Sequence, residues 1–135
     1  MSPRSSGFPG RRGVPSVPAP ILAVIDDDPL VRGAISSLVR SLGYGIAPFD
    51  SAEAFLEAAP TEVACILTDL QMPGLSGLDL CRLVREEGSQ VPMILMTAYA
   101  TPQTWERAAA YGLVALLEKP LDPDRLAASL VTALR

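Results

Sequence analysis

The chain has 135 residues, of which 49% are hydrophobic and 19% are charged, and its formal net charge is -4. This length and composition suit one globular domain with a buried core, whereas the acidic balance disfavours DNA contact through a broad basic face. The sequence contains no histidine, which excludes a Ser/His/Asp or Cys/His catalytic triad and a phosphohistidine on this chain.

The first twenty residues are rich in Pro, Gly and Ser and contain arginines but no acid. Such a segment buries too little apolar surface to order itself, so we expect a flexible tail at residues 1–20 and one domain at residues 21–135. No apolar run approaches the roughly 18 residues that a membrane span needs. Two isolated cysteines fit a reducing compartment, and we therefore expect a cytoplasmic protein without membrane contact.

Short apolar runs alternate with amphipathic stretches from residue 21 onwards. Four continuous runs predict strands buried on both faces: residues 21–25, 63–67, 92–96 and 113–117. A fifth run, residues 45–49, contains Pro48 and is expected at an edge of the sheet. Five strand–helix units without a hairpin signal predict a parallel, doubly wound α/β sheet with helices on both faces.

Helix-start signals follow most of these runs. Asp50 with Glu53 is predicted to form a capping box. The other predicted caps are Asp28 before Pro29, Ser76, Thr101, and Asp122 before Pro123. Trp105, in the stretch after Thr101, is expected to be a packing residue.

Ligands of an open α/β sheet bind beyond the carboxyl ends of its strands. The residues at these ends are Asp26-Asp27-Asp28, Thr68-Asp69, Thr97-Ala98 and Glu118-Lys119-Pro120. Carboxylates that converge on one rim repel one another unless a cation neutralises them, and Mg²⁺ prefers hard oxygen ligands. A carboxylate can also act as nucleophile and form an aspartyl phosphate. The pattern therefore predicts phosphoryl transfer to Asp69, with Lys119 supplying a charge and Thr97 a hydrogen bond.

Four stretches resemble the receiver domains of bacterial response regulators, the CheY-like superfamily, over essentially all of residues 21–135. They are V-I-D-D-D-P-L-V-R, L-T-D-L-Q-M-P-G-L-S-G-L-D-L, M-I-L-M-T-A and E-K-P. The resemblance implies a flavodoxin-like fold with strand order 2-1-3-4-5 and a phosphoacceptor switch of a two-component system. The implied phosphoryl donor is a sensor histidine kinase or a histidine phosphotransfer protein. The implied chemistry is the chain's own phosphorylation and slow dephosphorylation, not the turnover of a conventional enzyme.

The resemblance also implies a role for each site residue. Asp69 matches the phosphoacceptor, Thr97 the switch hydroxyl, and Lys119 the lysine that pairs with a phosphoryl oxygen. The bond between Lys119 and Pro120 matches one that is cis in the family. The implied ligands of Mg²⁺ or Mn²⁺ are Asp26, Asp27, Asp69 and the backbone carbonyl of Gln71.

One departure from the family keeps a second interpretation open. Leu116 stands where many receivers carry an aromatic residue that turns with the switch hydroxyl. The alternative is a receiver-like interaction module that signals without phosphate. A Mg²⁺-dependent phosphohydrolase is disfavoured, because Gln71 stands where such enzymes carry a second aspartate.

The partner surface is a further hypothesis from the resemblance. Residues of about 101–134 match a face that often mediates dimerisation or output contacts in the family, and the resemblance therefore implies a homodimer as a hypothesis. The sequence leaves open whether the chain is a single-domain regulator or the receiver portion of a longer one.

Overall fold

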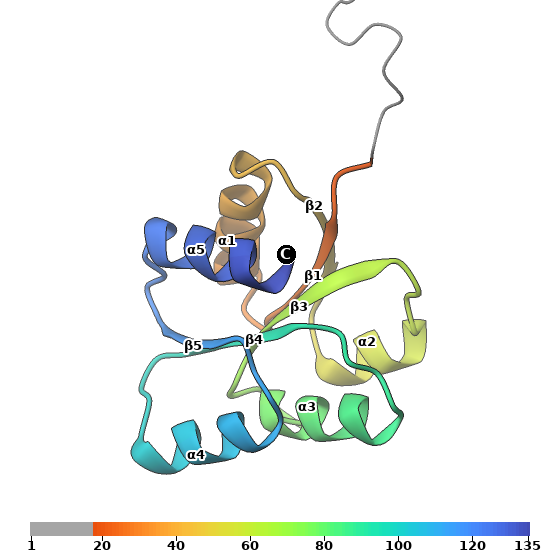
Figure 1. The fold of residues 1–135 in the computed structure, drawn as a ribbon, viewed down its shortest axis with the longest axis vertical. Helices are drawn as coiled ribbons and strands as arrows, with labels where there is room; N and C mark the ends of the chain where they lie inside the picture. Colours follow the sequence, from red (N-terminus) through yellow and green to blue (C-terminus); the bar gives the residue numbers. More distant parts are fainter. Residues whose placement is uncertain (1–17) are drawn as a thin grey trace, which may run out of the picture.

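Five parallel strands form one sheet in the order β2-β1-β3-β4-β5 in the computed structural model, which describes residues 18–135 (Figure 1). The strands are β1 Ile21–Ile25, β2 Gly45–Phe49, β3 Val63–Asp69, β4 Met93–Thr97 and β5 Ala115–Glu118. The helices are α1 Pro29–Ser41, α2 Ala52–Ala58, α3 Gly77–Glu86, α4 Pro102–Ala110 and α5 Pro123–Ala133. The predicted fold class and strand order are confirmed, and the strand that contains Pro48 lies at an edge. Most of the predicted tail, residues 1–17, lies outside the described residues.

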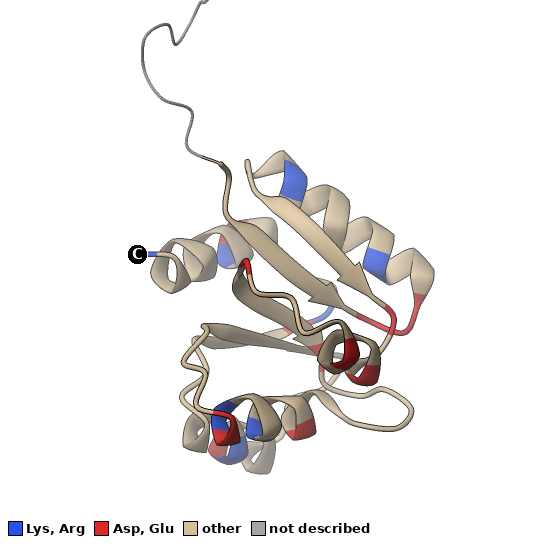
Figure 2. Cartoon of the chain, turned by 90° about the vertical axis from the view of Figure 1, so that its right-hand side faces the viewer, with Lys and Arg blue, Asp and Glu red and all other residues tan. Residues whose placement is uncertain are grey.

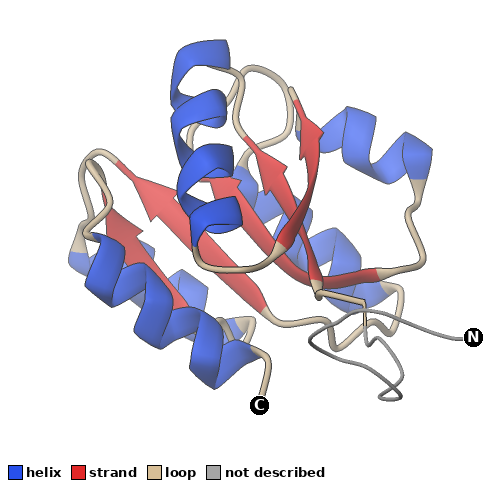
Figure 3. Cartoon of the chain, turned by 90° about the horizontal axis from the view of Figure 1, so that it is seen from above, coloured by secondary structure: helices blue, strands red, loops and turns tan. Residues whose placement is uncertain are grey.

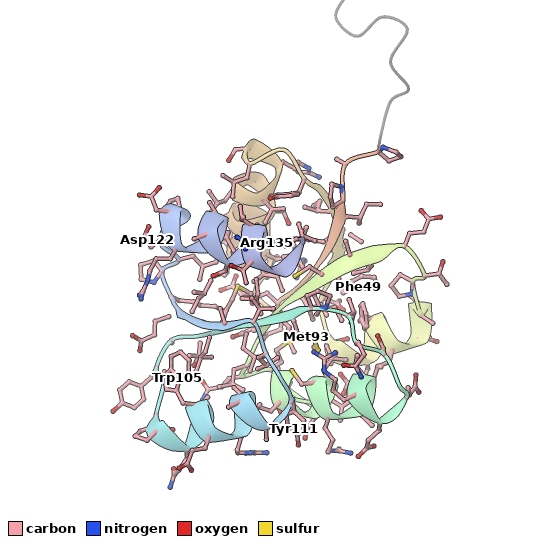
Figure 4. All side chains as sticks on the ribbon, in the orientation of Figure 1. Phe49, Met93, Trp105, Tyr111, Asp122 and Arg135 are labelled. Carbon is pink, nitrogen blue, oxygen red and sulfur yellow. The ribbon has the colours of Figure 1, made fainter. Side chains whose placement is uncertain are left out.

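Two hydrophobic cores lie on opposite faces of the sheet, because successive side chains of a strand point to opposite sides. Leu22 and Val24 of β1 pack with residues of α1 and α5, whereas Ala23 and Ile25 pack with residues of α2, α3 and α4. Figures 1 and 3 show this arrangement of helices on either side of the sheet. Met93, which begins β4, is fully buried near the centre of the fold (Figure 4). Within residues 18–135, every helix is too short or too polar to cross a membrane.

Most of the predicted helix caps are confirmed. The Asp28 carboxylate accepts the backbone N–H of Leu30 at 2.9 Å, and Pro29 opens α1. Ser76 and Asp79 form a complete capping box at the start of α3, and hydrogen bonds to the N-cap side chain satisfy amides that a helix leaves without partners.

The capping box predicted from Asp50 and Glu53 is wrong. Helix α2 begins at Ala52, so the capping position is Ser51, whose hydroxyl accepts the N–H of Ala54 at 3.0 Å. Glu53 instead accepts the N–H of Leu75 from the loop between β3 and α3, at 3.0 Å.

Trp105 is also not the packing residue that the sequence predicts. The buried residue of α4 is Ala108, and Trp105 is 52% exposed. A small residue of α4 thus belongs to the core cluster, and Trp105 lies at the periphery of the fold (Figure 4).

The parallel strands bring their carboxyl ends to one edge of the sheet. Figure 2 shows acidic residues in the loop beyond the strand tips at this edge. The ends of β1, β3, β4 and β5 carry the side chains from which the site is built.

We expect Leu95→Ala to lower the free energy of unfolding by about 2–5 kcal/mol, because Leu95 is fully buried in β4 and its truncation leaves a cavity. Leu30→Ala is the matched control, because Leu30 is 84% exposed and removal of the same atoms there should change little. Urea unfolding of both variants measures the difference, and equal losses would contradict the assignment of the core.

Candidate functional site

Three aspartates meet beyond the ends of β1 and β3. Asp26, Asp27 and Asp69 each offer a carboxylate oxygen, and these oxygens lie within 4.8 Å of one another. Asp26 is fully buried and Asp69 is 7% exposed, whereas Asp27 is open to solvent. The cluster is therefore a buried pair of carboxylates with a third at its mouth.

Lys119, which follows β5, joins the two buried carboxylates. Its Nζ atom lies 2.8 Å from Asp26 Oδ2 and 3.3 Å from Asp69 Oδ1. Among residues 18–135, this is the one ammonium that forms an ion pair with the cluster. Three carboxylates against one ammonium leave an excess of negative charge at the site.

The surroundings shift the pKa values of Asp69 and Lys119. Burial raises the pKa of Asp69, the negative charge of Asp26 raises it further, and Lys119 and the backbone amide of Gln71 oppose this. Burial alone would lower the pKa of Lys119, but its hydrogen bond with Asp26 and the charges of both aspartates outweigh burial and raise that pKa. Lys119 is therefore firmly protonated, while Asp69 ionises less readily than an exposed aspartate.

The buried carboxylate of Asp26 is held by the start of α1. Its Oδ1 atom accepts the N–H of Asp28 at 3.0 Å. The guanidinium of Arg32, one turn into α1, donates to the backbone carbonyl of Asp26 at 2.7 Å. The sequence reasoning missed Arg32, although its position one helical turn beyond Asp28 places it beside the strand end.

Thr97 ends β4 and is almost fully buried, at 1% exposure. Its hydroxyl donates to the carbonyl of Tyr99 at 3.1 Å and accepts the N–H of Tyr99 at 3.2 Å. The hydroxyl is thus bonded within the β4–α4 loop, whereas Lys119 contacts Asp26 and Asp69. A second contact holds this loop, because Glu118 Oε2 accepts the N–H of Ala100 at 3.2 Å. Sequence reasoning gave Glu118 no role, since this partner lies on another element.

Gln71 lies in the β3–α3 loop immediately beyond the Asp69 strand end. The N–H of Gly77 donates to the carbonyl of Leu70 at 2.8 Å and closes the base of this loop. A side chain at Gly77 would overlap the backbone oxygen of Asp69, so glycine allows α3 to begin directly against the strand end. The loop that carries Gln71 is therefore tightly bounded at both ends.

Leu116 packs in the core at 6% exposure. Where the resemblance implies a mobile aromatic residue, this chain has a buried aliphatic one. The bond between Lys119 and Pro120 is cis, as the resemblance implies.

The donor set fits a divalent cation of the Mg²⁺ type. The aspartates offer three hard oxygen ligands that converge within coordination range. The pairing with Lys119 leaves negative charge to be neutralised. Buried carboxylates repel one another without such neutralisation, which supplies a physical reason for a cation at this position.

Comparisons with known proteins identify the family of the chain. Residues 22–131 match the family model of the response regulator receiver domain. The transcriptional regulatory protein FixJ of Bradyrhizobium diazoefficiens is 38% identical over 113 residues, which cover 83% of this chain and 55% of that protein. The response regulator protein TodT of Pseudomonas putida is 34% identical over 118 residues, which cover 87% of this chain and 52% of that protein. The chain spans about half the length of these relatives.

Solved structures show the same fold. Full-length FixJ from B. japonicum superimposes with a TM-score of 0.79 at 36% identity, covering 88% of this chain and 59% of that one. A response regulator receiver protein from Pseudomonas putida has a TM-score of 0.76 at 26% identity, covering 87% of this chain and 99% of that one. The chain therefore belongs to the family of response regulator receiver domains.

Proposed function

We propose that this chain is a phosphoacceptor switch of a two-component system, in which Asp69 receives a phosphoryl group with the aid of Mg²⁺ or Mn²⁺. The donor is the phosphohistidine of a sensor histidine kinase or histidine phosphotransfer protein in the cytoplasm. The observation that carries the proposal is the pairing of Lys119 with both buried carboxylates of the Asp26–Asp27–Asp69 cluster.

The proposed reaction is a transfer between two nucleophiles. A carboxylate oxygen of Asp69 forms a bond to phosphorus while the bond from phosphorus to the donor imidazole nitrogen breaks, and the nitrogen keeps the electron pair. Lys119 already lies within 3.3 Å of Asp69, so its ammonium is placed to neutralise a phosphoryl oxygen. Slow attack of water on the acyl phosphate returns the switch to its starting state.

The metal ion would be held by the carboxylates of Asp26, Asp27 and Asp69 and by the backbone carbonyl of Gln71. The bound ion supplies neutralisation of the phosphoryl charge, which is the main requirement of phosphoryl transfer. Asp26 is oriented for this by Asp28 and by Lys119, so that its carboxylate needs little rearrangement.

Thr97 would link phosphorylation of Asp69 to a change in the conformation of the β4–α4 loop. Its hydroxyl now forms both of its bonds with Tyr99, and a turn toward a phosphoryl group on Asp69 breaks them. The β4–α4 loop would then keep its contact through Glu118 and Ala100. The altered loop and α4 present a different surface to a partner, and protein contact rather than DNA contact is the proposed output.

We expect one phosphoryl group per chain after incubation with acetyl phosphate and Mg²⁺, measured by intact mass. Asp69→Asn and a chelated sample should remain unlabelled, because the first lacks the nucleophile and the second the cation. Asp50→Asn is the matched control, since Asp50 is an exposed aspartate outside the cluster, and should be labelled like the wild type. An unlabelled wild type, under conditions that label another receiver, would favour the phosphate-independent interaction module.

We also expect Asp69→Asn to stabilise the metal-free protein at neutral pH. The pKa of Asp69 is raised in the folded state, chiefly by burial, so the fold loses stability as pH rises from the unfolded-state pKa through the folded-state pKa. Asparagine carries no charge and therefore removes this loss. The free energy of unfolding should rise by an amount on the order of 1 kcal/mol, the size of one interaction between charges.

Urea unfolding in chelator, from about pH 4 to pH 7, measures this difference. The advantage of Asp69→Asn should grow with pH, whereas Asp50→Asn should follow the wild type. An advantage that stays constant across this range, or a wild type that is the more stable protein at neutral pH, would contradict the assignment.

The surface of residues 101–134 is the proposed site of self-association. Trp105 on α4 and Val131 on α5 are 52% and 53% exposed, so this face offers apolar area that a second copy could bury. We expect the phosphorylated protein to sediment as a dimer and Trp105→Ala to weaken the dimer. A monomer both with and without the phosphoryl group would remove this part of the proposal.

A further inference from the structure

Glu53 forms a contact that neither helix capping nor the proposed chemistry requires. It lies in the first turn of α2, where Ser51 already serves as the cap. Its carboxylate crosses to the β3–α3 loop and accepts the N–H of Leu75 at 3.0 Å, a partner 22 residues away in the chain. Among the described residues, no other hydrogen bond joins the backbone of residues 72–75 to another element.

The loop is shaped to receive this carboxylate. Gly74, next to Leu75, has φ +77°, and a Cβ atom at this position would overlap the carboxylate of Glu53. A residue with a side chain would therefore push Glu53 away from the backbone. A positive φ and a close approach both favour glycine, so the loop and the carboxylate fit each other at this point.

The contact bears on the site because the same loop carries Gln71. The loop leaves the sheet at Leu70, whose N–H donates to Met96 at 2.7 Å, and returns at Gly77, whose N–H donates to Leu70 at 2.8 Å. In the described part of the chain, no hydrogen bond is formed by the backbone of residues 72–74 between these anchors, so the contact at Leu75 would bear on the direction of the Gln71 carbonyl. Glu53 holds the loop at Leu75, two residues before Gly77.

We propose that Glu53 is a positioning residue for the cation site, which acts by holding the β3–α3 loop so that the Gln71 carbonyl faces the aspartate cluster. This inference rests on the proposed function and extends it to a residue outside the cluster. Glu53 itself is not a ligand. Its effect passes through Leu75 and the loop backbone, as residues around a metal site orient the direct ligands.

Two conservative substitutions separate position from charge. Glu53→Asp keeps the negative charge but shortens the side chain by one methylene, so it loses its reach to Leu75. Glu53→Gln removes the charge but keeps an oxygen that can accept the Leu75 N–H. Glu57→Gln is the matched control, because Glu57 is an exposed glutamate one turn further along α2.

The experiment measures the Mg²⁺ dissociation constant by calorimetry and the hydrogen-exchange rate of the Leu75 amide by NMR in the metal-free protein. We expect Glu53→Asp to weaken Mg²⁺ binding by roughly tenfold, the lower end for residues that orient metal ligands, and to speed exchange at Leu75. Glu53→Gln should change both quantities less, and Glu57→Gln should match the wild type.

The opposite order would overturn the inference. If Glu53→Gln weakens Mg²⁺ binding more than Glu53→Asp does, the carboxylate acts through its charge alone. If both variants bind Mg²⁺ like the Glu57→Gln control, Glu53 has no role at the site, and the proposed phosphoacceptor function is unaffected. If the wild type binds no Mg²⁺, the proposed function fails in its metal requirement and the positioning role fails with it.

Discussion

The burial of two carboxylates at the edge of the sheet is the constraint on which the rest of the site depends. Asp26 and Asp69 are withdrawn from water at the ends of adjacent strands, where like charges repel strongly. Lys119 offsets part of this repulsion by contacting both. The negative charge that Lys119 leaves unpaired is the charge that a divalent cation would neutralise under the proposed function.

A site of this kind needs a rigid frame, because small displacements of the carboxylates would relieve the repulsion without any ligand. The frame is largely backbone: Leu70 bonds to β4, Lys119 to Thr97, and Asp26 to the end of β2. Gly77 lets α3 begin against the Asp69 strand end. The packed core of the sheet resists rearrangement, and it therefore keeps the like charges close together despite their repulsion.

Local sequence patterns predicted the strands, most of the helix caps and the residues at the strand ends. Buried strands are continuous apolar runs, and the carboxyl ends of parallel strands must share one edge, which was enough to predict that Asp26, Asp27, Asp69 and Lys119 meet. The patterns did not predict the contacts of Glu53 and Glu118, which join residues 22 and 18 positions apart. For Glu53, the spacing from Asp50 matches a capping box, but the helix begins one residue later than that pairing requires. Only the folded arrangement of α2 beside the β3–α3 loop reveals the actual partner.

The buried Leu116 bears on how a signal would leave the site in the proposed function. An aliphatic side chain packed in the core has no polar edge to exchange between the interior and solvent. In the proposed function, a turn of Thr97 would therefore act through the loop that follows it. That loop is held at two points, by the Thr97 hydroxyl on Tyr99 and by the Glu118 carboxylate on Ala100. If the contact between Thr97 and Tyr99 broke, the contact between Glu118 and Ala100 would still hold the loop. Glu118 is the residue directly before Lys119 in the chain. The end of β5 therefore carries both the lysine that is proposed to meet the phosphoryl group and the carboxylate that restrains the loop. In the proposed function, these neighbours would couple the chemistry to the shape of the surface without an aromatic residue.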